Sequence, residues 1–228
     1  YNEEDAISAT LESLVGQSNT HKYEVVLVDN NSKDNTAVLA RRYLKKLPLR
    51  IVKEKKQGRG AARAKGVAHA KGGVYAFIDA DTVAGSGWIN TITNSFEDKK
   101  VVAITGPWRM EDVSGLSKYI LNYLQLFSEL PYRLVYGHYW LNGMNMAIRK
   151  SAYLACGGFN KNINAHEDID ISNRLRKHGR IVFVPKMQVV TSGRRYKYGF
   201  FRGLWTYQKT ALRYFWLGDE NVNLEDVR

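Results

Sequence analysis

Two aspartates one residue apart follow a run of apolar residues in VYAFIDADTV, which spans residues 74–83. Alternate residues of an extended segment point to the same side, so the carboxylates of Asp79 and Asp81 can reach one cation. Oxygen ligands suit Mg²⁺ or Mn²⁺, which keep few protein ligands and complete their shell with phosphate oxygens and water. The pattern allows a divalent metal site, and it leaves open a solvated turn with two incidental acids.

A second stretch, GRGAARAKG (58–66), combines glycines with three cations. Glycines allow close backbone approach, and Arg59, Arg63 and Lys65 supply positive charge near a predicted helix N-terminus, which suits a phosphate. The spacing is not that of a P-loop. A solvated basic helix is the alternative.

A third stretch, NAHEDIDISNRL (164–175), gathers four titratable groups at a predicted helix start: His166, Glu167, Asp168 and Asp170. An acid beside other acids can have its pKa raised and serve as a general base. The alternative is the ordinary enrichment of acids at helix N-termini. A zinc site is disfavoured, because no second well-spaced histidine accompanies His166.

These residues need elements to position them, and strands alternate with helices along the first half. Such alternation predicts an open, largely parallel α/β sheet, in which ligands bind at the carboxyl ends of the strands. Asp29 and Asp79 each follow a predicted strand directly, so both are expected at that edge. In the helix after the first strand, Val38, Leu39, Tyr43 and Leu44 are expected to face inward. The predicted strands are 23–28, 50–53, 74–78, 101–105 and 181–185, and the predicted helices begin near residues 7, 36, 59, 87, 116 and 167.

The composition of the 228 residues, 44% hydrophobic and 25% charged, is that of a globular protein. The single cysteine, Cys156, excludes an internal disulfide and suits a reducing, cytoplasmic compartment. No apolar run approaches the 18 residues that a membrane span requires. The chain opens at Tyr1, without a methionine, in what reads as the middle of a motif, so the sequence is expected to be cropped, and the question of targeting or membrane segments at its ends stays open.

The formal net charge is +12, and the positive residues cluster. Residues 41–71 hold twelve Lys or Arg and one acid, and residues 194–213 hold six and none. Such a field favours an anionic partner: a nucleic acid, an anionic membrane or a phosphorylated small molecule. The mixture of basic and aromatic residues over 194–218 fits an interfacial helix on anionic lipid, or a terminal helix packed on the core.

Taken in order, these motifs resemble family 2 glycosyltransferases of the GT-A type. The resemblance extends from Tyr1 to about residue 195. It implies a GT-A-like α/β fold, with a Rossmann-like nucleotide-binding half and an acceptor-binding half. The segments that carry it are YNEE, DNNSKDNT, GRGAARAKG, DADT, GMNMAIRK, GGF and HEDID.

The resemblance also implies roles for individual residues. Asp29 reads the nucleotide base, Asp81 ligates the divalent ion with Asp79 beside it, and Asp168 is the general base, with Glu167 next to it. The implied nucleotide-sugar-binding residues are Asn2, Glu3, Asp29, Asn31, Arg59, Arg63, Asp79, Ala80 and Asp81. Arg194 and Arg195 are assigned to the diphosphate, and Trp140, Gly143 and Asn145 to the acceptor.

A single catalytic domain over residues 1–218 follows from this resemblance. Residues 1–105 form its nucleotide-sugar half, 106–193 its acceptor half and 194–218 a possible membrane-interfacial segment, with 219–228 as a tail. The implied reaction is inverting transfer of a hexose from a UDP-sugar or GDP-mannose to an acceptor hydroxyl, on a saccharide or a lipid-linked saccharide. The cofactor is Mn²⁺ or Mg²⁺, and the location is the cytoplasmic face of a membrane.

The chain also departs from the family pattern. The strand that normally precedes YNEE is missing, although it is central in the family's sheet. The histidine that often completes the metal site is absent from VVTSGRR, where Thr191 and Ser192 stand instead. The Q-x-x-R-W signature of processive polysaccharide synthases is also absent, which argues against a polymerising synthase.

Three other functions compete with this one. A polyprenyl-phosphate sugar synthase shares the fold, and its anionic acceptor needs no general base. A basic nucleic-acid-binding module leaves the acids at 79, 81, 167 and 168 unexplained, so no nucleic-acid partner is expected. A catalytically silent nucleotide-sugar-binding protein is disfavoured because both acidic motifs are retained. The sequence does not fix the donor sugar, the acceptor or the oligomeric state.

Overall fold

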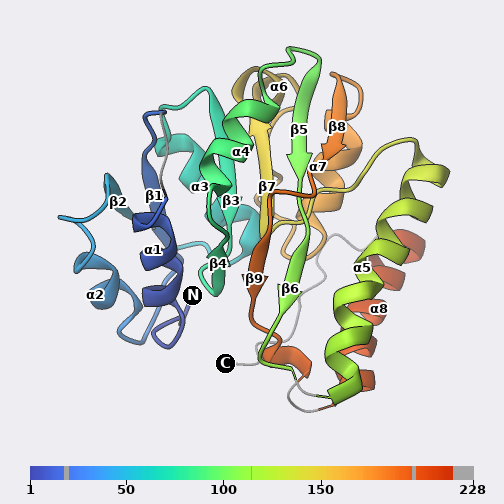
Figure 1. Ribbon diagram of the computed structural model, residues 1–228, viewed down its shortest axis with the longest axis horizontal. Helices are drawn as coiled ribbons and strands as arrows, with labels where there is room; N and C mark the ends of the chain where they lie inside the picture. The colour runs from blue at the N-terminus through green and yellow to red at the C-terminus, as the bar shows by residue number, and fades with distance from the viewer. Residues whose placement is uncertain (18–20, 114, 197–198, 218–228) are drawn as a thin grey trace.

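A computed structural model shows helices packed on mixed sheets (Figure 1), and it describes residues 1–17, 21–113, 115–196 and 199–217. The chain begins with α1 (Ile7–Val15), β1 (Val25–Asp29), α2 (Thr36–Arg41) and β2 (Leu49–Lys53). β1 and β2 pair in parallel, as the alternation of strands and helices predicts. Val38 in α2 and Leu44, which follows the helix, are 51% and 49% exposed, so the expectation that these two side chains face inward is wrong. Leu39 and Tyr43 do pack against the core, as expected.

The central sheet has the order β3-β7-β5-β8. Its strands are β3 (Val74–Ile78), β5 (Val101–Thr105), β7 (Asn145–Arg149) and β8 (Arg180–Phe183). β5 and β8 are parallel, but β7 runs antiparallel to both β3 and β5. The sheet is therefore mixed rather than mostly parallel, because β7 enters it between β3 and β5 from the opposite end.

A smaller sheet of three short strands has the order β4-β9-β6. β4 (Thr82–Ala84) begins directly after the two aspartates and pairs with β9 (Val189–Thr191), which also pairs with β6 (Trp108–Met110). The hydroxyls of Thr82 and Thr191 are hydrogen-bonded at 2.9 Å in the interior. This small sheet brings residues 192–196 next to the turn at residues 79–81.

The facing edges of β1 and β3 are not hydrogen-bonded to each other in the described part of the chain. Cavities of about 640 and 500 Å³ open along them, both lined by Val25 and Val26, and residues 25–28 are only half-buried despite their apolar character. β1 and β2 therefore form a two-stranded sheet that is separate from the central one.

The remaining helices lie around these sheets. α3 (Arg59–His69) packs on β1, and α4 (Trp88–Ser95) packs on β5. α5 (Gly115–Tyr136) and α8 (Phe200–Leu217) lie at the opposite side of the molecule from β1 and β2 (Figure 1). Within the described residues, no helix combines the length and the apolar character needed to cross a bilayer. The other helical elements are α6 (Lys150–Ala155), α7 (Glu167–Leu175) and the 3₁₀ turn η1 (Arg194–Tyr196).

The core has two parts, one on each face of the central sheet. One joins α1 and α4 to β5, with Leu11, Trp88 and Ile104 each at most 4% exposed. The other lies between β7 and α7, where Ile148, Ile171 and Leu175 are fully buried. Packing on both faces fixes the ends of β3 and α7, which carry the acidic residues.

Candidate active site

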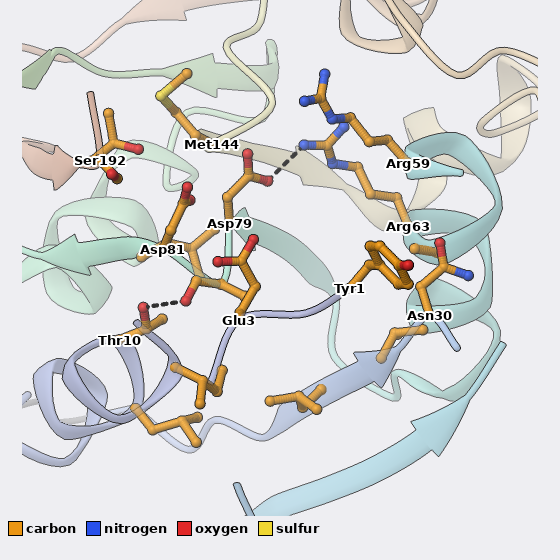
Figure 2. Close-up of a pocket in the computed structure, with 18 of the residues that line it drawn as sticks. Tyr1, Glu3, Thr10, Asn30, Arg59, Arg63, Asp79, Asp81, Met144 and Ser192 are labelled. Carbon is orange, nitrogen blue, oxygen red and sulfur yellow. Dashed lines mark hydrogen bonds and ion pairs between the residues drawn. The ribbon is translucent and has the colours of Figure 1, made fainter. Parts of the chain in front are cut away.

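The cavity of about 640 Å³ that runs along β1 reaches the turn after β3, where it forms an open pocket (Figure 2). The loop before α1, the start of α3, the turn after β3 and residues 191–196 surround it. It therefore lies where a sheet with parallel strands binds its ligands. Of the residues expected to bind the nucleotide sugar or its diphosphate, those lining it are Glu3, Arg59, Arg63, Asp79, Ala80, Asp81, Arg194 and Arg195.

Asp79 and Asp81 lie in the turn between β3 and β4. The backbone N–H of Thr82 donates to Asp79 O at 3.1 Å, and the Thr10 hydroxyl donates to Ala80 O at 2.8 Å. These bonds fix the turn so that both carboxylates face the pocket (Figure 2). Burial raises the pKa of Asp81 to about 6, the charges of Asp79 and Glu3 act in the same direction, and the Arg194 guanidinium opposes them.

Arg63, on α3, joins Asp79 to the start of α7. Its Nη2 donates to Asp79 Oδ1 at 2.8 Å, and its Nη1 donates to Glu167 Oε1. Burial opposes the charge of the guanidinium, but the carboxylates of Glu167 and Asp79 outweigh it and raise the pKa of Arg63. Burial likewise raises the pKa of Glu167, which is 3% exposed, while Arg63 stabilises its charged form. The Arg63 side chain is thus a fixed cation at the pocket wall.

Arg194 makes the corresponding link on the other side of the pocket. Its guanidinium forms a two-pronged contact with the Glu3 carboxylate, at 2.8 and 2.6 Å. Nη2 also donates to Asp81 Oδ2 at 2.7 Å. The N-terminal loop, the aspartate turn and the segment after β9 therefore meet at one guanidinium.

Asp168 lies in the first turn of α7 and outside the lining of this pocket. Its Oδ2 accepts the backbone N–H of Gly143 at 3.1 Å, and its Oδ1 accepts the N–H of Ile169 at 2.9 Å. The N-cap residue of α7, His166, has a left-handed backbone with φ 64°. Its side chain contacts α8, because the Nε2 atom of His166 lies 3.2 Å from Thr210 Oγ1. Asp168 lies beside the pocket rather than in its lining, because the Gly143 backbone that it binds lies against the guanidinium of Arg63.

The residues assigned to the acceptor lie around a buried polar network. Trp140 Nε1 donates to Asn142 Oδ1 at 2.7 Å, and Asn142 Nδ2 donates to Glu129 Oε1 at 2.9 Å. Burial raises the pKa of Glu129 to about 8. Asn145 is fully buried: its amide donates to Pro107 O and Met187 O and accepts from Trp88 Nε1. Asn145 thus holds β7 to its neighbours and does not face the pocket.

Several other expected residues also lie outside the pocket lining. Asp29 is 8% exposed, and its Oδ1 accepts the backbone N–H of Ser32 at 2.9 Å, so it orders the turn after β1. Asn2, in the loop before α1, contacts the same turn through its Oδ1, which accepts the N–H of Lys33. Asn31 is exposed in a left-handed conformation. The expected residues outside this lining are Asn2, Asp29, Asn31, Trp140, Gly143, Asn145, Glu167 and Asp168.

The pocket is also lined by residues that the sequence motifs did not mark as functional, among them Tyr1, Asn30, Met144 and Asn164. Asn30 is 6% exposed; its amide donates to Glu54 O and Lys56 O, and its Oδ1 accepts the N–H of Gly58. It thereby fixes the loop that leads into α3. The turn cluster DNNSKDNT contains this residue, but composition alone does not tell its buried asparagine from its exposed ones.

The carboxylates suit a divalent cation with few protein ligands. Within the described residues, no group of three or more His, Cys, Asp or Glu side chains is arranged to hold a metal. Asp81 and Asp79 offer hard oxygen donors to an open pocket. Thr191 and Ser192, which also line it, occupy the segment in which the family often has a metal-binding histidine. A cation here would take most of its ligands from water and from the ligand's phosphate oxygens.

The fold is that of the GT-A glycosyltransferases. It resembles the mannosyltransferase PcManGT from Pyrobaculum calidifontis, solved in complex with GDP-Man and Mn²⁺, with a TM-score of 0.67, 22% identity and coverage of 84% of this chain and 54% of that one. It also resembles S. aureus TarS 1-349 in complex with UDP-GlcNAc, with a TM-score of 0.65, 20% identity and coverage of 84% and 56%.

The family model for glycosyl transferase family 2 matches residues 1–157, and the chain belongs to this family. The chondroitin synthase of Pasteurella multocida is 30% identical over 135 residues, which cover 58% of this chain and 14% of that protein. The dodecaprenyl-phosphate galacturonate synthase of Rhizobium johnstonii is 31% identical over 121 residues, which cover 51% and 36%. The matched stretches thus span only a minor part of the length of these relatives.

Proposed function

We propose that this glycosyltransferase moves a hexose from a UDP-sugar or GDP-mannose to an acceptor hydroxyl, with inversion at the anomeric carbon. The acceptor is a saccharide, in particular a lipid-linked one. The observation that carries the proposal is the pocket itself: two aspartates and four arginines converge at the carboxyl ends of β1 and β3. The aspartates suit a divalent cation, and the arginines suit a diphosphate.

The arginines stabilise the leaving group. When the bond between the sugar and the diphosphate breaks, the departing nucleoside diphosphate gains negative charge, which nearby cations stabilise. Arg59, Arg63, Arg194 and Arg195 line the pocket on two sides. A divalent ion held by Asp81 and Asp79, Mn²⁺ or Mg²⁺, would supply further Lewis-acid stabilisation of the same charge.

Asp168 is assigned the role of general base. The acceptor oxygen forms its bond to the anomeric carbon as the bond to the diphosphate breaks, and the hydroxyl proton moves to the Asp168 carboxylate. The N–H of Gly143 orients that carboxylate. Glu167 supports the base indirectly, because its contact with Arg63 fixes the first turn of α7.

Acceptor recognition is assigned to the surface formed by Trp140 and Gly143, with Asn145 as its structural support. The Trp140 ring is half-buried and oriented by its bond to Asn142, so it offers an aromatic face on which a sugar can stack. Asn2, Asp29 and Asn31 are assigned to the nucleotide, to which the turn after β1 contributes.

A polyprenyl-phosphate sugar synthase is the second candidate, favoured by the similarity to dodecaprenyl-phosphate galacturonate synthase. An acceptor phosphate is already ionised, so Asp168 would have no proton to accept. The two candidates therefore differ in whether turnover depends on Asp168.

We place the protein at the cytoplasmic face of an anionic membrane, which α8 contacts. Phe201, Trp205 and Leu212 are 81%, 65% and 49% exposed on this helix, with Arg202 and Lys209 exposed among them. Exposed apolar side chains flanked by cations suit the interface of a bilayer with acidic headgroups.

A panel of nucleotide sugars tests the donor assignment. Thermal unfolding is followed with each UDP-sugar and with GDP-mannose, with and without Mn²⁺, because a bound donor raises the melting temperature by mass action. One donor class is expected to stabilise the protein only with the metal and to be hydrolysed slowly. Absence of stabilisation by every donor would contradict the proposal, and equal stabilisation without metal would contradict the role of the cation.

A further inference from the structure

The guanidinium of Arg194 contacts the carboxylates of both Glu3 and Asp81 at the wall of the pocket. Glu3 is 4% exposed, and the side chains of Asp81 and Arg194 are 14% and 27% exposed. Such pairs are shielded from water, so the guanidinium supplies much of the positive charge that these acids need. Arg194 thus occupies the place at Asp81 where the proposed function puts a divalent cation.

We propose that Arg194 is an exchangeable counter-ion. In the resting protein it neutralises Glu3 and Asp81, and when a divalent cation and a nucleoside diphosphate bind, it leaves Asp81 and contacts the diphosphate. The inference rests on the proposed function, because it needs a cation at Asp81. It adds a role that a fixed diphosphate-binding arginine does not have, namely competition with the metal.

The surrounding contacts allow this exchange. The backbone around Arg194 is held independently of its guanidinium: the Gly193 N–H donates to Asp112 Oδ1 at 2.6 Å, and the Ser192 hydroxyl donates to Asp112 Oδ2 at 2.8 Å. The side chain can therefore move while its segment stays in place. Because Arg194 also lines the pocket, a diphosphate there lies on the same side as its guanidinium.

Arg63 provides a contrast on the opposite wall. Its side chain is 10% exposed and bonded to Glu167, which is buried outside the pocket lining. Moving Arg63 would leave a buried carboxylate without its cation, which is costly. Arg194 instead holds two carboxylates that both line the pocket, so an incoming cation can replace it for both. Of these two arginines, Arg194 is the one placed to exchange.

The test measures Mn²⁺ binding to the purified protein in the absence of nucleotide, by electron paramagnetic resonance of free Mn²⁺. The Arg194→Gln variant is expected to bind Mn²⁺ about tenfold more tightly than the wild type, because one charge-assisted contact no longer has to be broken. Arg195→Gln is the matched control, since it removes the same charge one residue away in the same pocket. It is expected to change Mn²⁺ affinity by less than about twofold.

A second measurement follows the nucleoside diphosphate with Mn²⁺ saturating. Arg194→Gln is expected to bind UDP or GDP about tenfold more weakly, the opposite sign to its effect on Mn²⁺ alone. Arg194→Lys keeps the charge but loses the two-pronged geometry, so its affinity for UDP or GDP is expected to lie between those of the wild type and Arg194→Gln. This variant replaces Arg194→Gln in the test if the glutamine variant does not fold.

The outcomes separate this inference from the proposed function. If the wild type binds Mn²⁺ and Arg194→Gln binds it no more tightly, the counter-ion role is wrong while the metal site stands. Unchanged nucleotide affinity would overturn the transfer to the diphosphate. If neither protein binds Mn²⁺, even with the nucleotide present, the metal site itself is wrong and the exchange has no basis.

Discussion

The guanidinium of Arg63 lies directly against the backbone of Gly143, where a Cβ atom would fall 2.5 Å from Nη2 of the arginine. Gly143→Ala is therefore expected to push Arg63 off Asp79 and lower nucleotide-sugar affinity. Overpacking of this kind costs about 1–3 kcal/mol, less where a side-chain tip can shift, so the expected loss is at the low end, about fivefold in Kd. Donor titrations by calorimetry measure it.

Gly73→Ala is the matched control for that substitution. No heavy atom beyond its chain neighbours lies within 4 Å of a Cβ built at residue 73, and Gly73 does not have a left-handed backbone. Its donor affinity and melting temperature should equal those of the wild type. Wild-type affinity in the Gly143→Ala variant would show that the Arg63 side chain can shift without weakening the binding of the donor.

Removing the charge of Arg63 is expected to destabilise the protein in a pH-dependent way. In Arg63→Met, Glu167 is left buried without a cation, at a cost of about 3 kcal/mol near neutral pH. The pKa of Glu167 in the folded state then lies further above its ordinary value of 4.5. A raised folded-state pKa means that stability is retained below the unfolded value and lost as pH rises through the folded value. Urea unfolding from pH 4 to 8 should show the deficit growing with pH.

Arg63→Met/Glu167→Gln is the control for this effect. Both charges are then absent, so most of the lost stability and its pH dependence should return, because Asp79 is 38% exposed and can be hydrated. A double variant as unstable as Arg63→Met would show that lost packing of the arginine, rather than an unpaired carboxylate, causes the deficit.

The sequence predicted the elements with clear periodicity and left out those without it. The strands at 74–78 and 101–105 lie where their apolar runs place them. β4, β6 and β9 have three residues each, which is too short for an alternating pattern, and their pairing is between distant parts of the chain. The antiparallel direction of β7 depends on the path of residues 106–144, which no local pattern encodes.

The site shows the same division. The aspartate turn and the basic start of α3 could be predicted as pocket residues because each lies at the end of its own element. The link from Glu3 to Arg194 joins residues 191 positions apart, and Glu167 meets Arg63 across 104. The sequence contains both arginines, but their acidic partners follow only from the fold.

Asp168→Asn tests the base assignment. Asparagine can still accept the Gly143 N–H but cannot take up a proton, so transfer to a sugar hydroxyl should fall about 10²- to 10⁴-fold while donor affinity stays within about twofold. Turnover at the wild-type rate with a saccharide acceptor would refute the assignment. Retained transfer to a polyprenyl phosphate, with none to a hydroxyl, would instead favour the synthase candidate.

The α8 surface is expected to bind anionic vesicles. The protein should co-sediment with phosphatidylglycerol liposomes at low salt, and less at high salt, because screening weakens attraction between exposed charges. Trp205→Ser/Lys209→Glu should reduce the bound fraction several-fold, whereas Lys99→Glu, on the exposed turn before β5, should not. Equal sedimentation of all three proteins would exclude α8 as the contact.

The buried carboxyl of Glu129 makes stability depend on pH near neutrality. Its pKa of about 8, raised from 4.5 by burial, means that the folded protein binds a proton there which the unfolded chain has already released at pH 7. This group therefore favours folding fully below pH 4.5, and its contribution is lost as pH rises through 8. Glu129→Gln keeps an oxygen for Asn142 and carries no charge at any pH, so it should be more stable than the wild type by about 4 kcal/mol at pH 8 and nearly equal to it at pH 4.5. Thermal melts of both proteins across this range measure the difference, with Glu97→Gln on the exposed turn after α4 as a control whose melts should follow the wild type. A constant offset between Glu129→Gln and the wild type at all pH values would show that the carboxyl does not titrate on unfolding.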